Sequence, residues 1–158
     1  MAQLTSNALG AIVPSLKTLG LQKANSPLGL ILRPGLPPTV RIGSGKPVAA
    51  DEKDVNNTDA NITITLNELN ADFYVWSSDR YIRAFTSTLN LAVPLNIDVG
   101  SNGALTPVLS KIFVTSAKVT NNDLVKEDPA KIESAVSQLI GGLAGQFVGG
   151  ALPSFDLS

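Results

Sequence analysis

The sequence predicts an α+β fold: a long, highly curved antiparallel sheet wrapped around a long C-terminal helix, with a short N-terminal helix. In residues 81–99 most of the large apolar side chains share one parity and most of the polar ones share the other, which is typical of a strand with one buried face. At about 3.3 Å per residue such a strand extends roughly 60 Å, so we expect it to bend around another element. Residues 129–147 carry apolar side chains at helical spacing, which predicts that element.

The composition indicates a single domain, residues 1–158, either as a protein of its own or as a segment of a longer one. Charged residues make up 16% of the chain and the formal net charge is −1, so the basic patch of a nucleic-acid-binding protein is not expected. The chain contains no cysteine and no histidine, which excludes disulfides, thiolate chemistry and imidazole bases. We therefore expect no enzyme activity, no cofactor and no metal.

The N-terminal third is predicted to hold short elements broken by proline. Apolar residues at helical spacing indicate a helix or two within residues 4–21, with Pro14 as a kink or a new start. Two short apolar stretches, residues 28–32 and residues 39–42, are typical of edge strands. The Pro34-Gly35 pair predicts the turn between them.

The central part is predicted to be a series of long antiparallel strands. Alternation begins at Ile62 and changes parity at Glu68, which indicates a β-bulge there. Residues 77–79 predict a turn into the long strand. Residues 100–103, with the sequence Gly-Ser-Asn-Gly, predict a tight hairpin, and residues 105–119 predict one return strand.

Clear start signals precede the C-terminal helix. Asp128 is a good N-cap and Pro129 fits the first helical turn. Gly141, Gly145 and Gly149 recur every four residues, although each glycine costs about 1 kcal/mol relative to alanine inside a helix. Two explanations stay open: close packing of the helix on the sheet, or a groove with room for an acyl chain. The GxxxG pattern of paired membrane helices is a third, but the apolar stretch from Leu139 to Leu152 is too short to span a bilayer.

Other polar and aromatic clusters allow weaker interpretations. The aromatic residues near one hairpin end pack in the core or form a lipid-facing or partner-facing tip beside Arg80 and Arg83: Phe73, Tyr74, Trp76, Tyr81 and Phe85. The oxygen-rich residues 51–59 lack the spacing of a calcium-binding EF-hand. Glu68 and Asp72 are carboxylates that an enzyme would need, but only their nearness in sequence links them.

The order of these elements resembles the tubular lipid-binding (TULIP) superfamily, in particular one half of a bactericidal/permeability-increasing-protein-like module. The matching stretches are residues 28–43, 62–99, 104–123 and 128–157, the last ending in Leu-Pro-Ser-Phe-Asp-Leu. The resemblance implies a curved sheet around a long helix, with an apolar seam between them that takes lipid tails. The chain is shorter than the usual module and lacks the disulfide of the animal members.

We therefore expect non-catalytic binding of lipid or another hydrophobic ligand. The expected lining residues are Phe85, Leu89, Leu91, Val93, Leu95, Phe113, Leu139, Leu143 and Phe147. The alternative is a structural or interaction module that is packed shut within a homo-oligomer or a larger assembly. No window of 18 apolar residues predicts a transmembrane segment, and an exported location is favoured over a cytoplasmic one.

Overall fold

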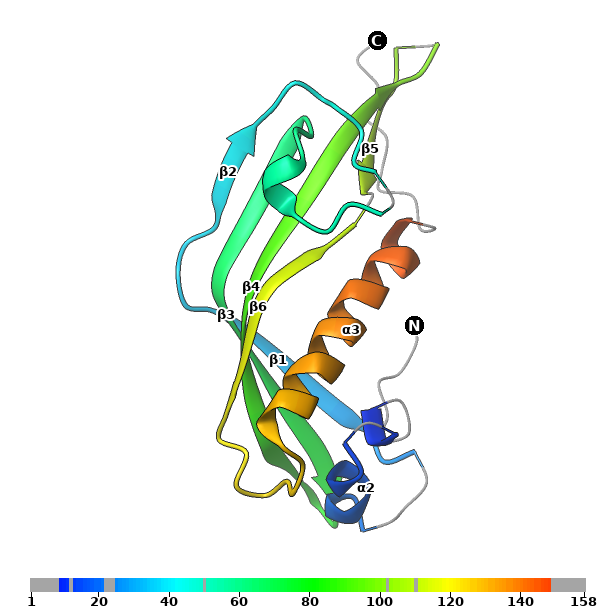
Figure 1. The fold of residues 1–158 in the computed structure, drawn as a ribbon. Helices are drawn as coiled ribbons and strands as arrows, with labels where there is room; N and C mark the ends of the chain where they lie inside the picture. Colours follow the sequence, from blue (N-terminus) through cyan, green and yellow to red (C-terminus); the bar gives the residue numbers. More distant parts are fainter. Residues whose placement is uncertain are drawn as a thin grey trace.

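The computed structural model describes residues 9–11, 13–21, 25–49, 51–101, 103–109 and 111–148, the last six by their backbone only. The elements in chain order are α2 (Ser15–Leu19), β1 (Leu28–Pro34), β2 (Thr39–Ile42), a short 3-10 helix (Val55–Asn57), β3 (Ile62–Ser77), β4 (Arg80–Val99), β5 (Leu105–Leu109), β6 (Phe113–Thr120) and α3 (Pro129–Val148). The α+β class with a short N-terminal helix and a long C-terminal helix is confirmed (Figure 1).

All six strands form one antiparallel sheet with β3 and β4 at its centre. Strands β1 and β2 follow one another along the outer edge of β3, while β5 and β6 follow one another along the outer edge of β4. Helix α3 packs mainly against β6, and α2 lies at the end where β3 turns into β4 (Figure 1). The long strand predicted from residue 81 to residue 99 is confirmed as β4.

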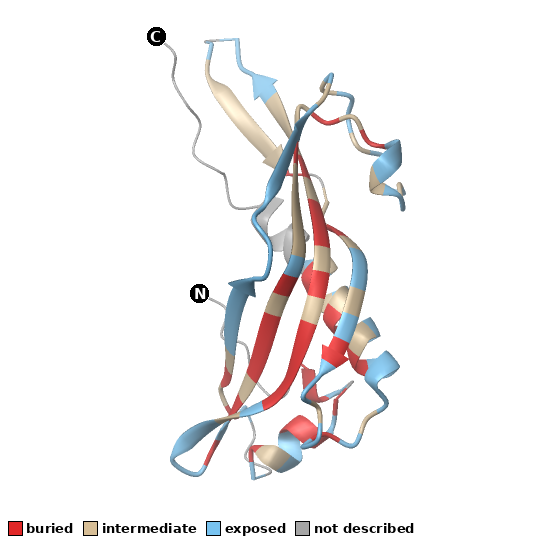
Figure 2. Ribbon diagram, turned by 90° about the vertical axis from the view of Figure 1, so that its left-hand side faces the viewer, coloured by how far each residue is buried: buried red, intermediate tan, exposed pale blue. Residues whose placement is uncertain are grey.

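One face of the sheet, called here the inner face, packs against α3 and carries the core. On it Phe73 pairs with Phe85 across β3 and β4, and their rings stack with centroids 4.6 Å apart. Ile132 and Val136 of α3 are fully buried in the same cluster, and Leu16 of α2 is buried with them at one end. Figure 2 shows the buried residues concentrated in the middle and lower parts of the two long strands.

Two irregularities in the β3–β4 pairing decide which side chains reach the inner face. The predicted bulge at Glu68 is confirmed, because the register shifts between Leu66 and Leu69 and Glu68 has a φ of 54°. A second shift falls where Phe73 pairs with Phe85 but Tyr74 pairs with Arg83, so Ala84 is the extra residue. The shared parity of Tyr81 with the apolar residues after it was therefore misleading, because this bulge turns Tyr81 to the outer face beside Trp76.

The prediction of one return strand over residues 105–119 was wrong. The structure has two strands, because Leu109 pairs with Leu95 whereas Phe113 pairs with Ala92. Phe113 follows Leu109 by four residues, whereas their partners on β4, Ala92 and Leu95, are three residues apart. The one extra residue separates β5 from β6. The mixed apolar pattern reflects these changes of register rather than one strand covered on both faces.

Helix starts follow the local sequence signals. Asp128 caps α3, since its Oδ1 accepts a hydrogen bond of 2.8 Å from the backbone N–H of Ala130. Pro14 immediately precedes α2, as expected for a proline that interrupts one helical segment and opens the next. The predicted end of the long helix at Leu152-Pro153 lies outside the described residues.

The bulge geometry yields a prediction about stability. Replacing Glu68 with glycine should raise the free energy of unfolding by about 0.5–1 kcal/mol, because glycine adopts positive φ without the cost that other residues meet. Replacing Glu68 with valine should lower it, since a β-branched side chain fits this conformation poorly. Urea denaturation of the three proteins measures both effects; a glycine variant no more stable than the valine variant would contradict a strained bulge.

Candidate functional site

The predicted lining residues at the lower end of the inner face belong to a filled core. Phe85 and Leu89 have no exposed surface, and they pack in one cluster with Phe73, Ile132 and Val136. Their packing contributes to stability in the same way as any buried apolar contact. A ligand surface on the inner face must therefore lie further along the sheet.

Beyond this core the inner face continues as an apolar surface, which we call the open apolar face. The register places Ile42, Ile62 and Leu95 in one row across β2, β3 and β4, and Val40, Ile64 and Val93 in the next. The face consists of Val40, Ile42, Ile62, Ile64, Val93, Leu95, Ile97 and Val99. Sequence analysis named Val93 and Leu95 but missed their partners, although the alternation from Ile62 to Leu66 was a usable signal.

The open apolar face is incompletely covered. Val40, Ile42 and Val99 are 61%, 74% and 71% exposed, and the other members are only partly buried. Leu91, a predicted lining residue that is almost fully buried, marks the boundary with the core. Contiguous exposed apolar surface of this kind is typical of sites that bind ligands, partners or membranes.

Strand β5 and helix α3 border this face. Leu109 and Pro107 of β5 pair with Leu95 and Ile97 of β4, which extends the apolar rows by one strand. On α3, the predicted lining residue Leu139 is partly buried and packs against the core. Leu143 and Phe147 lie in α3, but their side chains fall outside the described part of the chain.

The glycines of α3 favour space beside the helix over close packing. A Cβ atom built on Gly141 or Gly142 would meet no atom of another described element within 4 Å. At this level of α3 the glycines therefore do not serve a close approach of the helix backbone to the sheet. Gly149 lies outside the described residues.

Phe113, another predicted lining residue, lies on the opposite face of the sheet. It pairs with Ala92, whose neighbours Leu91 and Val93 point to the inner face, so Phe113 points outward. It is buried there, with Lys111 Nζ lying 5.3 Å from its ring centroid. The structure thus separates Phe113 from the other predicted lining residues because of the extra residue between β5 and β6.

The oxygen-rich residues 51–59 cover the outer face of the sheet. The guanidinium of Arg41 donates a 2.9 Å hydrogen bond to the carbonyl of Thr58, and the Ser44 hydroxyl donates one of 2.5 Å to Asp59. The Ser44 hydrogen bonds hold the pKa of Asp59 below its usual value. Within the described ranges no group of three or more acidic residues is arranged to hold a metal ion.

Asp72, one of the two carboxylates considered for catalysis, is a structural ion-pair partner on the outer face. It is buried, and it accepts hydrogen bonds of 2.9 Å from Arg33 and 2.7 Å from Thr86. Burial alone would raise the pKa of Asp72, but the hydrogen bonds from Thr86 and Arg33 and the Arg33 charge together lower it. Glu68 is exposed at the bulge and shares none of these bonds.

One part of the inner face is a filled core and the other part is the open apolar face. We therefore expect the same side-chain truncation to lower the free energy of unfolding by different amounts in the two parts. Leu89→Ala should lower the free energy of unfolding by about 2–5 kcal/mol, because Leu89 has no exposed surface and the substitution leaves a cavity in a filled core. Leu95→Ala on the open apolar face should cost about 1 kcal/mol or less, because its side chain is only partly removed from water. Urea denaturation measures both, and similar losses for the two variants would contradict the division.

The Arg33–Asp72 pair predicts a pH-dependent contribution to stability. At pH 7, Arg33→Ala should lower the free energy of unfolding by about 1–2 kcal/mol. This loss is larger than that expected for a fully exposed ion pair and smaller than the largest losses of a charged hydrogen bond, because Asp72 is buried but Arg33 is not. Because the folded pKa of Asp72 is lowered, the stabilisation is complete above the unfolded pKa of about 3.9 and is lost as pH falls through the folded pKa. Urea denaturation between pH 7 and pH 2.5 should show that the free energies of unfolding of the variant and the parent protein become more similar as the pH falls. Arg80→Ala is the control, since its partner Asp79 is exposed; a loss at Arg33 that does not depend on pH would contradict this account.

No described helix is long and apolar enough to span a bilayer. No protein-family model, curated protein or solved structure matches the chain. The functional argument therefore rests on the geometry of the inner face.

Proposed function

We propose that this chain is a non-catalytic binder of lipid or another hydrophobic ligand, and that the ligand's alkyl chain lies on the open apolar face. The observation that carries the proposal is the set of apolar rows across β2, β3 and β4, which are only partly covered. Each CH₂ group removed from water onto such a surface contributes about 0.8 kcal/mol. The proposal includes the curved, helix-wrapping sheet that the TULIP resemblance implies.

The chemistry of the face favours the alkyl part of a ligand over a polar group. Its side chains are valine, leucine and isoleucine alone. The charged residues of this end point to the outer face, where Arg41 bonds Thr58 and Lys111 Nζ bonds the carbonyl of Glu52. Such a surface binds hydrocarbon through contact area rather than through directed hydrogen bonds.

The competing function is a structural module whose open apolar face is covered by another protein. The high exposure of Val40 and Ile42 at the edge of that face favours it, because edge residues are readily reached by a partner. The two functions differ in what accompanies the purified protein. Native mass spectrometry distinguishes a lipid adduct from a protein complex.

The proposal predicts that one charge on the open apolar face weakens ligand binding. Val93→Asp should weaken the binding of a fluorescent fatty acid at least tenfold, because a carboxylate would lie among the apolar rows. Thr65→Asp is the matched control, since Thr65 is partly buried and points to the outer face opposite Ala92.

Fluorescence titration measures the affinity, and circular dichroism verifies that both variants are folded. Equal weakening by the two variants would place the fatty acid elsewhere on the protein. Absence of both probe binding and co-purified lipid in the parent protein would contradict the proposal itself.

A further inference from the structure

Strand β1 exposes apolar side chains on both faces of the sheet. Leu30 and Leu32 pair with Phe73 and Ala71 and so point inward, whereas Ile31 points outward opposite Asp72. Leu30, Ile31 and Leu32 are 36%, 49% and 52% exposed. A ligand on one face covers only half of this surface, but a strand laid along the edge of β1 covers both halves at once.

The edge of β1 lacks the usual protection against such pairing. In the described part of the chain β1 pairs with β3 alone, and residues 28–32 contain no charge and no proline. The other edge strand beside β3 is different: β2 has four residues, follows Pro37 and Pro38 and contains Arg41. Charges, prolines and short length are the devices that keep edge strands from associating, and β1 has them only at its ends.

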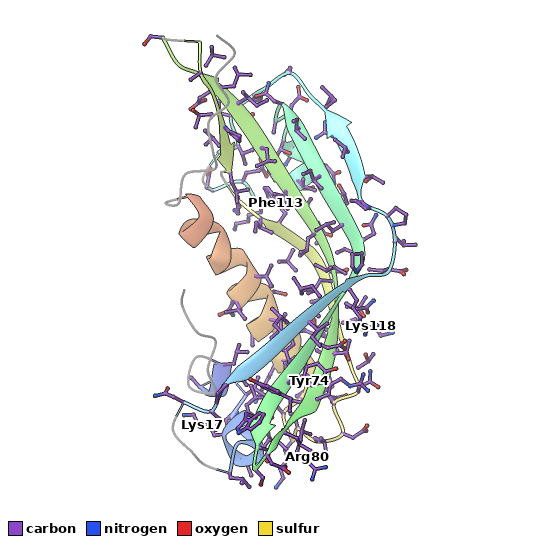
Figure 3. The ribbon with its side chains drawn as sticks, turned by 180° about the vertical axis from the view of Figure 1, so that it is seen from behind. Lys17, Tyr74, Arg80, Phe113 and Lys118 are labelled. Atoms are coloured by element: carbon purple, nitrogen blue, oxygen red, sulfur yellow. The ribbon has the colours of Figure 1, made fainter. Side chains whose placement is uncertain are left out.

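The outer face of β1 also carries an apolar cleft of about 410 Å³, lined by Gly29, Leu30, Ile31, Tyr74 and Tyr81. Gly29 opens this cleft, since a Cβ atom there would lie 3.5 Å from both tyrosines. The Tyr81 ring is held by an edge-on contact with Trp76, at 5.0 Å between centroids. The cleft lies toward the same end of the molecule as Arg80, as the labelled Tyr74 shows in Figure 3.

We propose that β1 pairs antiparallel with β1 of a second copy of this chain, about a two-fold axis at Leu30. In this register Leu30 faces its own counterpart, and Ile31 of each copy lies opposite Gly29 of the other. Paired residues in antiparallel strands point to the same face, so each Ile31 enters the cleft between the tyrosines of the other copy. Leu32 of each copy then lies beside Leu28 of the other on the inner face, at the margin of the core in which Leu28 is buried.

Neighbouring registers fit less well. An axis at Ile31 would place Arg33 opposite Gly29, which brings a charge to an apolar cleft. An axis at Gly29 would leave both clefts without a side chain from the partner. The axis at Leu30 alone puts an isoleucine in both clefts, and it pairs Arg33 with Pro27 rather than with another arginine.

Engineered cysteines test this register, because the chain has no cysteine of its own. Directly opposed residues in antiparallel strands have Cα atoms about 4.5–5.5 Å apart, which a disulfide can span. Leu30→Cys should therefore form a covalent dimer under mild oxidation, followed by non-reducing electrophoresis. Leu32→Cys is the matched control on the same face. In this register the substituted residues of the two copies would lie about 13 Å apart along the strands, too far for a disulfide.

We expect cross-linking of the Leu30→Cys protein at least tenfold faster than that of the Leu32→Cys protein. Equal rates would overturn the register. In analytical ultracentrifugation the unmodified protein should dimerise, and Ile31→Lys should raise the dissociation constant at least tenfold, because it brings a charge to the apolar cleft. Leu124→Lys is the matched control: Leu124 is as exposed as Ile31 but follows β6, at the opposite edge of the sheet from β1, so its substitution should leave the dissociation constant unchanged.

A protein that stays monomeric up to high micromolar concentration would overturn the proposal. An effect of Leu124→Lys as large as that of Ile31→Lys would overturn it as well. Ile31 is half exposed in one copy and lies opposite the Asp72 carboxylate, so Ile31→Lys should keep the fold, and circular dichroism verifies this. The readouts require no lipid and are independent of the proposed ligand site.

Discussion

The pairing of β3 with β4 is the constraint on which the other surfaces of the molecule depend. Successive side chains of a strand point to opposite faces, so each extra residue exchanges the faces of everything beyond it. The bulges at Glu68 and Ala84 lie on either side of the stacked Phe73–Phe85 pair. Between them the core is filled; outside them the same two strands present an open apolar face at one end and outward-facing tyrosines at the other.

This arrangement gives the sheet more apolar surface than the described elements cover. Helix α3 and α2 bury the inner face around Phe85, but Ile64, Val93 and their row neighbours stay partly in water. Burying apolar surface gains roughly 25 cal/mol per Å², so a surface of this extent gives a hydrocarbon chain or a partner a substantial gain. No directed polar group on it competes for that gain.

Much of this fold could be predicted because its signals are local. A parity change marks the bulge at Glu68, and an Asp-Pro pair marks the start of α3, so each is visible within a few residues. The bulge at Ala84 leaves only a single mark, because Arg83 is the one charged residue among the neighbours that share the parity of Tyr81 and Phe85. At the break before Phe113, Leu109 and Phe113 share one parity although an extra residue lies between their strands, which explains why Phe113, like Tyr81, was assigned to the wrong face. Burial also could not be predicted: Phe85 and Val93 have the same parity, but only the helix above Phe85 makes it core.

The two uncovered surfaces differ in geometry, and this difference assigns them different occupants. The open apolar face is a single surface several strands wide, which suits a flexible chain laid across it. The edge of β1 is one strand wide but apolar on both sides, and among the described strands this edge pairs with none, which favours a strand that brings side chains to both faces. Because Leu30 and Leu32 point to the inner face, pairing through β1 would set the inner faces of two copies side by side. An assembly of that kind would enlarge the apolar surface of the pair and leave the rows through Ile64 and Val93 accessible.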